Sequence, residues 1–200
     1  MARKATISRE VILEAALKML IRDGYSSVNV KTLAAEIGCS TQPIVWHFEN
    51  MEGLRMALAE YAMMYAAKKA VSNYDDKIES FEYLGRAYVK MAFKEPNLFR
   101  FLYLGENPMG KPYSLKDVGS KKNKDMIAKI SAQTGLGEEK VIRFVRNTII
   151  YSHGIATMIA TGVLKGTEKE IMRMINDAAD AFIINEGMDP AKLQKMGDGK

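Results

Sequence analysis

Cysteine and histidine are scarce in this chain, whose 200 residues include only Cys39, His47 and His153 of these two types. A lone cysteine cannot close an intramolecular disulfide, and it fits a reducing compartment, so we expect a cytoplasmic protein. Two histidines far apart, without further cysteines, lack the ligand spacing of a zinc site. We therefore expect no metal and no cofactor, and we interpret Cys39 as a small hydrophobe rather than a redox sensor.

Proline and strand patterns are also rare. The chain has five prolines, and no stretch alternates β-branched and polar residues as a half-buried strand does. Methionine, with 14 residues, and alanine are abundant. We find no cluster of serine, histidine and acid, no glycine-rich phosphate loop and no carboxylate pair with a catalytic role. These absences predict an all-α protein that is not an enzyme.

Charge is absent from Asn147 to Leu164, and about 18 apolar residues is the length of a membrane-spanning helix. Six polar residues interrupt this stretch: Asn147, Thr148, Ser152, His153, Thr157 and Thr161. A helix that is apolar or small on all sides is one that other elements cover on all sides. We therefore expect a buried helix and no membrane. The charged helix that follows residues 1–8 also argues against a signal peptide.

Basic charge is missing from the N-terminal quarter, although the whole chain carries a net charge of +5. Residues 1–54 hold six bases and six acids, so their net charge is zero. The basic excess lies mainly in Lys111, Lys116, Lys121, Lys122, Lys124 and Lys129. A DNA-binding domain without net positive charge should gain little from counterion release.

A stretch near the N-terminus has the pattern of two short helices joined at a glycine. Asn29 is placed to cap an amphipathic helix over 30–37, and Gly38 can end that helix by taking a positive φ. Ser40 is placed to cap a second helix over 41–47. Two helices that meet at such a turn form a helix-turn-helix, whose second helix enters the major groove of DNA. We therefore predict a DNA-binding protein.

Helical periodicity continues through the rest of the chain. A helix over 9–23, capped by Ser8 and ended by Gly24, completes a three-helix head. Six more helices are expected over 51–71, 76–94, 96–104, 120–134, 138–164 and from the Thr167–Glu170 capping box to Gly187. We divide the chain into a helix-turn-helix DNA-binding domain at 1–54, a helical body at 55–187 and a flexible tail at 188–200.

About nine helices in this order, with the helix-turn-helix in second and third place, resemble the tetracycline-repressor (TetR) family. The head carries the family pattern G-x-S-x(6)-H-F as Gly38, Ser40, His47 and Phe48, followed by Asn50, Glu52 and Leu54. This match covers about a quarter of the chain, whereas the body resembles the family only in helix order. The resemblance implies a ligand-responsive transcriptional regulator, and more specifically a repressor that a small apolar molecule releases from a palindromic operator.

The expected contacts with double-stranded operator DNA follow from the placement of the motif. They are Lys31, Thr32, Ser40, Thr41, Gln42, Pro43, Trp46 and His47. Gln42 can pair with adenine through two hydrogen bonds, and Thr41 can meet a base edge or a thymine methyl group. The competing interpretations are that Thr41 and Gln42 are merely exposed polar residues and that Trp46 belongs to the core.

Three positions depart from the family and weaken the expected hold on phosphate. The family usually has tyrosine at position 45 and often has lysine at 41 and 51, where this chain has Val45, Thr41 and Met51. Phosphate contacts then have to come from fewer side chains and from backbone amides at helix N-termini. A helical interaction or ligand-binding module that keeps the fold but has lost specific DNA binding is therefore the alternative function.

The TetR resemblance also implies that the body at 55–187 encloses an effector site and mediates dimerisation. Flexible methionines and tyrosine hydroxyls suit an adaptable, largely apolar ligand. The expected ligand-binding residues are Tyr88, Met91, Phe99, Tyr103, Asn147, Tyr151 and His153. Asn147 and His153 would be the polar anchors, because buried polar groups need partners. Each of these residues could equally serve the core alone.

The last two predicted helices are too apolar to face water. Small residues that allow close approach of another helix are Ser152, Gly154, Ala156, Ala160 and Gly162. An isologous homodimer through a four-helix bundle would cover both helices. It would also present two recognition helices to a palindromic operator.

Overall fold

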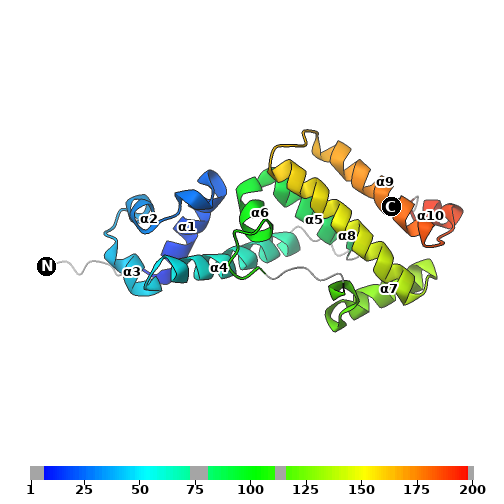
Figure 1. Ribbon diagram of the computed structural model, residues 1–200, viewed down its shortest axis with the longest axis horizontal. Helices are drawn as coiled ribbons and strands as arrows, with labels where there is room; N and C mark the ends of the chain where they lie inside the picture. The colour runs from blue at the N-terminus through cyan, green and yellow to red at the C-terminus, as the bar shows by residue number, and fades with distance from the viewer. Residues whose placement is uncertain (1–6, 73–80, 111–115, 198–200) are drawn as a thin grey trace. The chain divides into compact units, whose positions relative to one another are not determined.

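The computed structural model describes residues 7–72, 81–110 and 116–197, and Figure 1 shows the path of the chain. All regular structure in these ranges is helical, which confirms the all-α prediction. The α-helices are α1 (Arg9–Asp23), α2 (Val30–Ile37), α3 (Gln42–Phe48), α4 (Met51–Ser72), α5 (Phe81–Lys94), α6 (Pro96–Tyr103), α7 (Lys124–Thr134), α8 (Glu138–Ala160), α9 (Glu168–Asn185) and α10 (Pro190–Gly197). Short 3-10 helices lie at η1 (Tyr25–Ser27), η2 (Asp117–Gly119) and η3 (Lys121–Asn123).

The chain forms two compact units, each with its own hydrophobic core. The first unit comprises Met1–Tyr74 with Met91–Lys111, and the second comprises Asp75–Lys90 with Pro112–Lys200. The domain boundary at 54/55 stays a prediction. The first unit extends beyond it, because α4 and α6 share their core with the three N-terminal helices.

Helix α1 is the centre of the first unit and packs against α2, α3, α4 and α6. The side chain of Ser8 caps it by accepting a hydrogen bond from the Val11 amide (3.3 Å). Its buried face is Ile12, Leu13, Ala16, Leu17, Met19 and Leu20. The i, i+3, i+4 spacing of these residues places them on one side of the helix, so α1 fills the core while its other side stays in water.

Helix α6 is fastened to the end of α1 by Asn97. The Asn97 amide group donates to the backbone carbonyls of Ile21 (3.0 Å) and Arg22 (3.2 Å). The last carbonyls of a helix have no partner within the helix, so Asn97 satisfies two groups that would otherwise need water. The ring of Phe101 adds a stacked contact with Tyr25 at a centroid distance of 5.0 Å.

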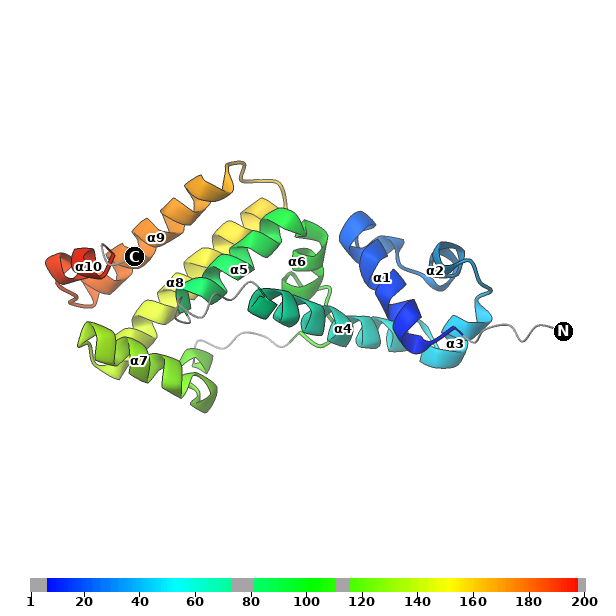
Figure 2. The same cartoon turned by 180° about the vertical axis from the view of Figure 1, so that it is seen from behind.

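Helices α8 and α9 form the antiparallel pair of the second unit, and they lie side by side in Figures 1 and 2. The guanidinium of Arg143 donates to the Glu186 carboxylate at 2.7 Å. Further along the pair, the Tyr151 ring meets Phe182 edge-on at 6.1 Å. These two contacts fix the register in which residues near 150 on α8 face residues near 184 on α9.

Only part of α8 is covered within this protomer, whereas the sequence predicts a helix covered on all sides. Ser152, Ala156 and Ala160 are buried, so these small residues pack inside the unit rather than awaiting another protomer. Ile150 and Met158 remain 49% and 39% exposed. Burial of these small residues agrees with the expected close approach of another helix, their role in a dimer stays a prediction, and the exposed face of α8 carries Ile150 and Met158.

Several helix ends differ from their predicted positions. Helix α3 begins at Gln42, and its N-cap is Thr41, which makes no side-chain capping bond, so Ser40 is not the cap. Helix α8 ends at Ala160 rather than near Leu164, because Gly162 turns the chain with φ +76°. The predicted helix over 76–94 is described from Phe81 onward.

A short helix, α10 (Pro190–Gly197), occupies most of the expected flexible tail. Met188 is buried, and Leu193 packs against the core of the second unit. The Lys192 ammonium donates to the Thr134 carbonyl at the end of α7 (3.0 Å). The tail is polar in overall composition, so the packing of Met188 and Leu193 is not evident from its sequence. In the structure most of this segment is a helix that packs on the second unit.

Candidate functional site

The first helix of the predicted motif, α2, is closed at both ends by its own sequence. The Asn29 carbonyl oxygen Oδ1 accepts from the amides of Lys31 and Thr32 (3.0 Å each), and the Thr32 hydroxyl accepts from the Asn29 amide (3.1 Å). This reciprocal capping box confirms the predicted role of Asn29. Gly38 ends α2 in the left-handed conformation, with φ +77°. A tight turn to α3 follows, as a helix-turn-helix requires.

Helix α3 has one buried face and one exposed face. Ile44 and Phe48 are buried in the head and fix the helix to α1 and α4. Gln42 and Val45 are exposed, and the Trp46 side chain is 72% exposed. An indole this open to water does not belong to the core, so the core interpretation of Trp46 is wrong. The exposed face of α3 is the surface that can enter a DNA groove.

Two of the predicted DNA contacts already have partners within the head. The Thr32 hydroxyl donates to the Ser27 carbonyl at 2.7 Å. Nε2 of His47 lies 2.9 Å from the Ile7 carbonyl and is therefore its donor. These bonds give Thr32 and His47 structural roles at the motif. Their contact with phosphate stays a prediction.

The remaining predicted contacts lie at the surface of the motif. Lys31, Ser40 and Thr41 are exposed, and Pro43 is half-buried near the start of α3. The structure thus brings the predicted DNA-contacting residues together on α2, the turn and α3. Their contact with bases is a proposal, taken up below.

Ion pairs within the head remove part of its basic charge from DNA. The Arg22 guanidinium makes two hydrogen bonds to Glu36, at 3.0 and 3.1 Å, and also pairs with Asp23. The hydrogen bonds from Arg22 hold the pKa of Glu36 below its ordinary value. Lys18 pairs with Glu14 at 2.8 Å along α1. Like the neutral net charge of the head, these ion pairs limit the number of basic side chains that are available to bind DNA phosphates.

The predicted ligand-binding residues divide between the two units. Met91, Phe99 and Tyr103 belong to the first. Phe99 is buried, and its ring lies 5.2 Å from that of Tyr103. Met91 packs against the core that α1 and α4 share.

In the second unit the structure brings two predicted residues, Tyr88 of α5 and His153 of α8, directly together. The Tyr88 hydroxyl lies 2.5 Å from Nδ1 of His153. Burial lowers the pKa of His153, so its imidazole is neutral near pH 7. Asn147 and Tyr151 precede His153 on α8 and are half-buried, and the Tyr151 ring contacts that of Phe182.

Sequence reasoning missed two polar positions near the predicted ligand residues. Thr157, one turn after His153, has a buried hydroxyl with no hydrogen-bond partner among the described residues. Glu95, between α5 and α6, is buried and accepts from the Tyr65 hydroxyl and the Lys69 ammonium, each at 2.8 Å. The four-residue spacing from His153 was a usable signal for Thr157. The partners of Glu95 lie 26 and 30 positions away, beyond any local pattern.

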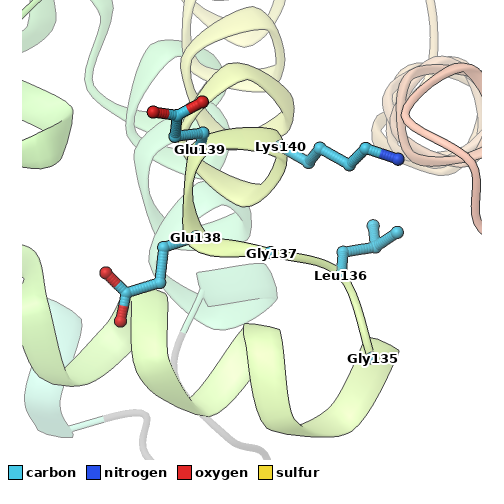
Figure 3. Close-up of a pocket in the computed structure, with 6 residues that line it drawn as sticks. All are labelled: Gly135, Leu136, Gly137, Glu138, Glu139 and Lys140. Carbon is cyan, nitrogen blue, oxygen red and sulfur yellow. The ribbon is translucent and has the colours of Figure 1, made fainter.

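A surface hollow of about 460 Å³ lies at the corner between α7 and α8. Figure 3 shows its lining, which is Gly135, Leu136, Gly137, Glu138, Glu139 and Lys140. In this view the Lys140 side chain points away from the two glutamate carboxylates. None of the predicted ligand-binding residues lines this hollow, so it is not the predicted effector site.

Within the described ranges, no group of three or more histidine, cysteine, aspartate or glutamate residues is arranged to hold a metal ion. No helix in the same ranges is both long enough and apolar enough to cross a bilayer.

Comparison with known proteins shows which family the head resembles. The family model described as bacterial regulatory proteins, tetR family, matches residues 12–58. Residues 12–58 therefore carry the N-terminal domain of the tetR family. The chain is also 39% identical, over 57 residues, to an uncharacterized HTH-type transcriptional regulator of Mycobacterium tuberculosis. That match covers 28% of this chain and 26% of the relative, so the chain spans about a quarter of the length of the curated relative it matches.

The TetR match coincides with the part of the chain whose geometry is described above. It begins within α1 and ends within α4, so it includes the whole helix-turn-helix. The departures at Thr41, Val45 and Met51 lie inside the matched region.

Proposed function

We propose that this protein is a transcriptional regulator that binds a palindromic operator as a homodimer and is released from it by a small, largely apolar molecule. The observation that carries the proposal is the exposed face of α3, with Gln42 and the open indole of Trp46 on a helix anchored by Ile44 and Phe48. A large aromatic left in water beside a base-reading side chain fits a surface that is covered by a partner.

Direct reading of DNA requires a rigid helix with polar side chains at its N-terminal end. Thr41 and Gln42 occupy that end of α3 and are exposed. Gln42 has the donor and acceptor needed to pair with the major-groove edge of adenine. The backbone amides at the start of α3 have no side-chain cap, which leaves them available for a phosphate.

The homodimer is supported by the exposed apolar residues of α8 and α9. On α8 these are Ile150 (49%) and Met158 (39%), and on α9 they are Met174 (40%) and Ile184 (39%). The register set by Arg143–Glu186 and Tyr151–Phe182 places Ile150 near the level of Ile184 and Met158 near that of Met174. A second copy would cover these residues in a four-helix bundle.

Release by a ligand requires that the head respond to the body. Within the first unit, α4 and α6 are both packed on α1, and Asn97 joins α6 to the end of α1. Tyr65 and Lys69 of α4 hold Glu95 at the start of α6. A displacement of α4 or α6 would therefore be passed to the recognition helix, and we propose that the ligand shifts the equilibrium between two such arrangements.

Selection of DNA from a random pool by the full-length protein tests the regulator. We expect enrichment of a palindrome with half-sites centred about 34–36 Å apart, or a multiple of that distance. The salt dependence of binding should be shallow, because the neutral head releases few counterions. A log–log slope on the order of −10 would reveal a basic surface outside the motif.

A ligand-binding helical module without specific DNA binding is the second candidate. It is favoured by the neutral head, by the ion pairs of Arg22 and Lys18, and by the exposed Val45 where the family usually has tyrosine. The same selection discriminates between the two functions. Recovery of unenriched DNA at low salt, where non-specific binding is strongest, would favour the module.

A further inference from the structure

Thr157 of α8 differs from three other threonines of the second unit that lie in a helix or at its C-cap. Thr134, Thr148 and Thr161 each donate from the hydroxyl to the backbone carbonyl four residues earlier, at 2.7, 2.9 and 2.7 Å. Thr157 does not make this bond, and its Oγ1 is buried without a partner in the part of the chain that the structure describes. A buried hydroxyl without a partner is costly, so its presence calls for an explanation.

Two other polar groups of the second unit belong to the same part of α8 and to α5. His153 precedes Thr157 by four residues, so both project from the same face of α8. The Tyr88 hydroxyl of α5 is held 2.5 Å from Nδ1 of His153. We call Tyr88, His153 and Thr157 the polar triad, and all three belong to the second unit.

The charge around the triad restricts what it can receive. No charged residue occurs in the sequence between Arg146 and Lys165, which includes the last 14 residues of α8. On α5 the nearest charged residues to Tyr88 are Arg86 and Lys90, and both are exposed. The imidazole of His153 is neutral near pH 7, because burial lowers its pKa. An ionised group on a ligand would find no buried counter-ion among the described residues of α8 and α5, which is unfavourable for a buried charge.

We infer that the polar triad is the polar end of the effector site and binds an uncharged hydrogen-bonding group, a hydroxyl or carbonyl, on an otherwise apolar molecule. The inference rests on the proposed function, because it assumes that the protein has an effector. The Thr157 hydroxyl donates to the oxygen of that group, and the bond supplies the partner that Thr157 lacks in the free protein. Specificity for the ligand would come from pairing its uncharged polar group with the Thr157 hydroxyl.

Replacing Thr157 by valine tests the unpaired hydroxyl without a ligand. Thr157→Val removes the buried oxygen and keeps the shape of the side chain. We expect the melting temperature of the ligand-free variant to exceed that of wild type by roughly 2–4 °C. Thr148→Val is the matched control, since it removes a hydroxyl that already has a partner, and it should bring no gain. A lower melting temperature for Thr157→Val, or an unchanged one, would overturn the inference.

Three probes with one apolar chain and different ends test the ligand class. They are octan-1-ol, octanoate and octylammonium, and their binding is followed by the shift in melting temperature of the full-length protein. We expect octan-1-ol to stabilise wild type and Thr148→Val more than either ionised probe does. Its affinity for Thr157→Val should fall about fivefold, the effect of one neutral hydrogen bond. Equal affinities in wild type and Thr157→Val, preference for an ionised probe, or no binding of the alcohol would each contradict the inference.

Two controls keep this result separate from the proposed regulation. Sedimentation should give the same oligomeric state for wild type and Thr157→Val, whereas a change would assign the hydroxyl to a subunit interface and remove it from a ligand site. Operator selection without any probe reports on DNA binding alone. If no operator is selected while alcohol binding still depends on Thr157, the proposed regulatory function is contradicted and the ligand site is supported. The opposite pair of results leaves a regulator whose effector site lies elsewhere.

Discussion

Gln42 is the residue on which the proposed recognition of DNA bases would depend most directly. It is the first residue of α3, it is exposed, and its neighbours Ile44 and Phe48 hold the helix against the core. A glutamine amide carries both a donor and an acceptor, which is the pattern required by the major-groove edge of adenine. A phosphate contact by the same side chain would carry no sequence information.

Substitution of Gln42 by alanine should relax the preference at one base pair of each half-site. The expected loss is about 1–3 kcal/mol for the preferred base and close to nothing for the other three. Competition gel shifts with operators altered one base at a time measure this difference. Gln133→Ala on α7, outside the head, is the matched control and should leave the pattern unchanged. A uniform loss across all operators would make Gln42 a backbone contact.

At the level of helices, local signals predicted the beginnings and ends of several elements. The caps Ser8, Asn29 and Thr167, and the stop at Gly38, are as the sequence indicates, because each depends on residues within four positions. The start of α3 was mispredicted, since Ser40 has a capping side chain but lies one residue too early.

Contacts between distant segments could not be predicted from local patterns. The pairing of Tyr88 with His153 joins residues 65 positions apart, and that of Arg143 with Glu186 joins residues 43 apart. The sequence proposes Tyr88 and His153 for one site on other grounds, but nothing in their spacing shows that they touch. The buried state of Glu95 is likewise a product of packing, because an isolated glutamate in a sequence indicates exposure.

The cap of α2 offers a prediction about stability. Asn29→Ala removes the acceptor for the amides of Lys31 and Thr32, so it should cost about 0.5–2 kcal/mol of unfolding free energy. Thermal or urea unfolding of the full chain measures the loss. Ser40→Ala is the matched control, because Ser40 does not cap α3, and its stability should equal that of wild type. An equal loss in both variants would show that Ser40 has a structural partner after all.

The end of α9 offers a prediction about pH. Hydrogen bonds from Arg143 lower the pKa of Glu186, so the ion pair stabilises the fold above the ordinary glutamate pKa and is lost as the pH falls through the lowered value. Glu186→Gln should therefore melt below wild type at pH 7. The difference should shrink as the pH falls below about 4.3. Melting curves from pH 7 to 3 test this, with Asp177→Asn, from an exposed pair on α9, as a control that should show little difference. A difference that persists at pH 3 would point to packing instead of charge.

At the level of the whole molecule, the proposed dimer and the proposed reading of a palindrome depend on each other. One copy carries one recognition helix, and a palindromic operator needs two related by a twofold axis. The exposed apolar residues on α8 and α9 are where a second copy would bury surface. Breaking that contact should therefore weaken operator binding without touching α3.

Ile150→Glu tests this coupling at a side chain that is 49% exposed on α8. A buried charge at the centre of the interface should give a folded monomer by sedimentation at micromolar concentration, with an unchanged helical circular dichroism spectrum. Operator affinity should fall sharply, because a monomer binds only one half-site. Ala160→Glu is unsuitable, since Ala160 is buried inside the protomer and its substitution would test folding instead. Val163→Glu is the matched control: Val163 is 70% exposed and lies beyond the end of α8, so this variant should remain a dimer with full affinity. A dimeric Ile150→Glu protein with wild-type affinity would move the interface away from α8, and the twofold arrangement of the heads would then need another surface.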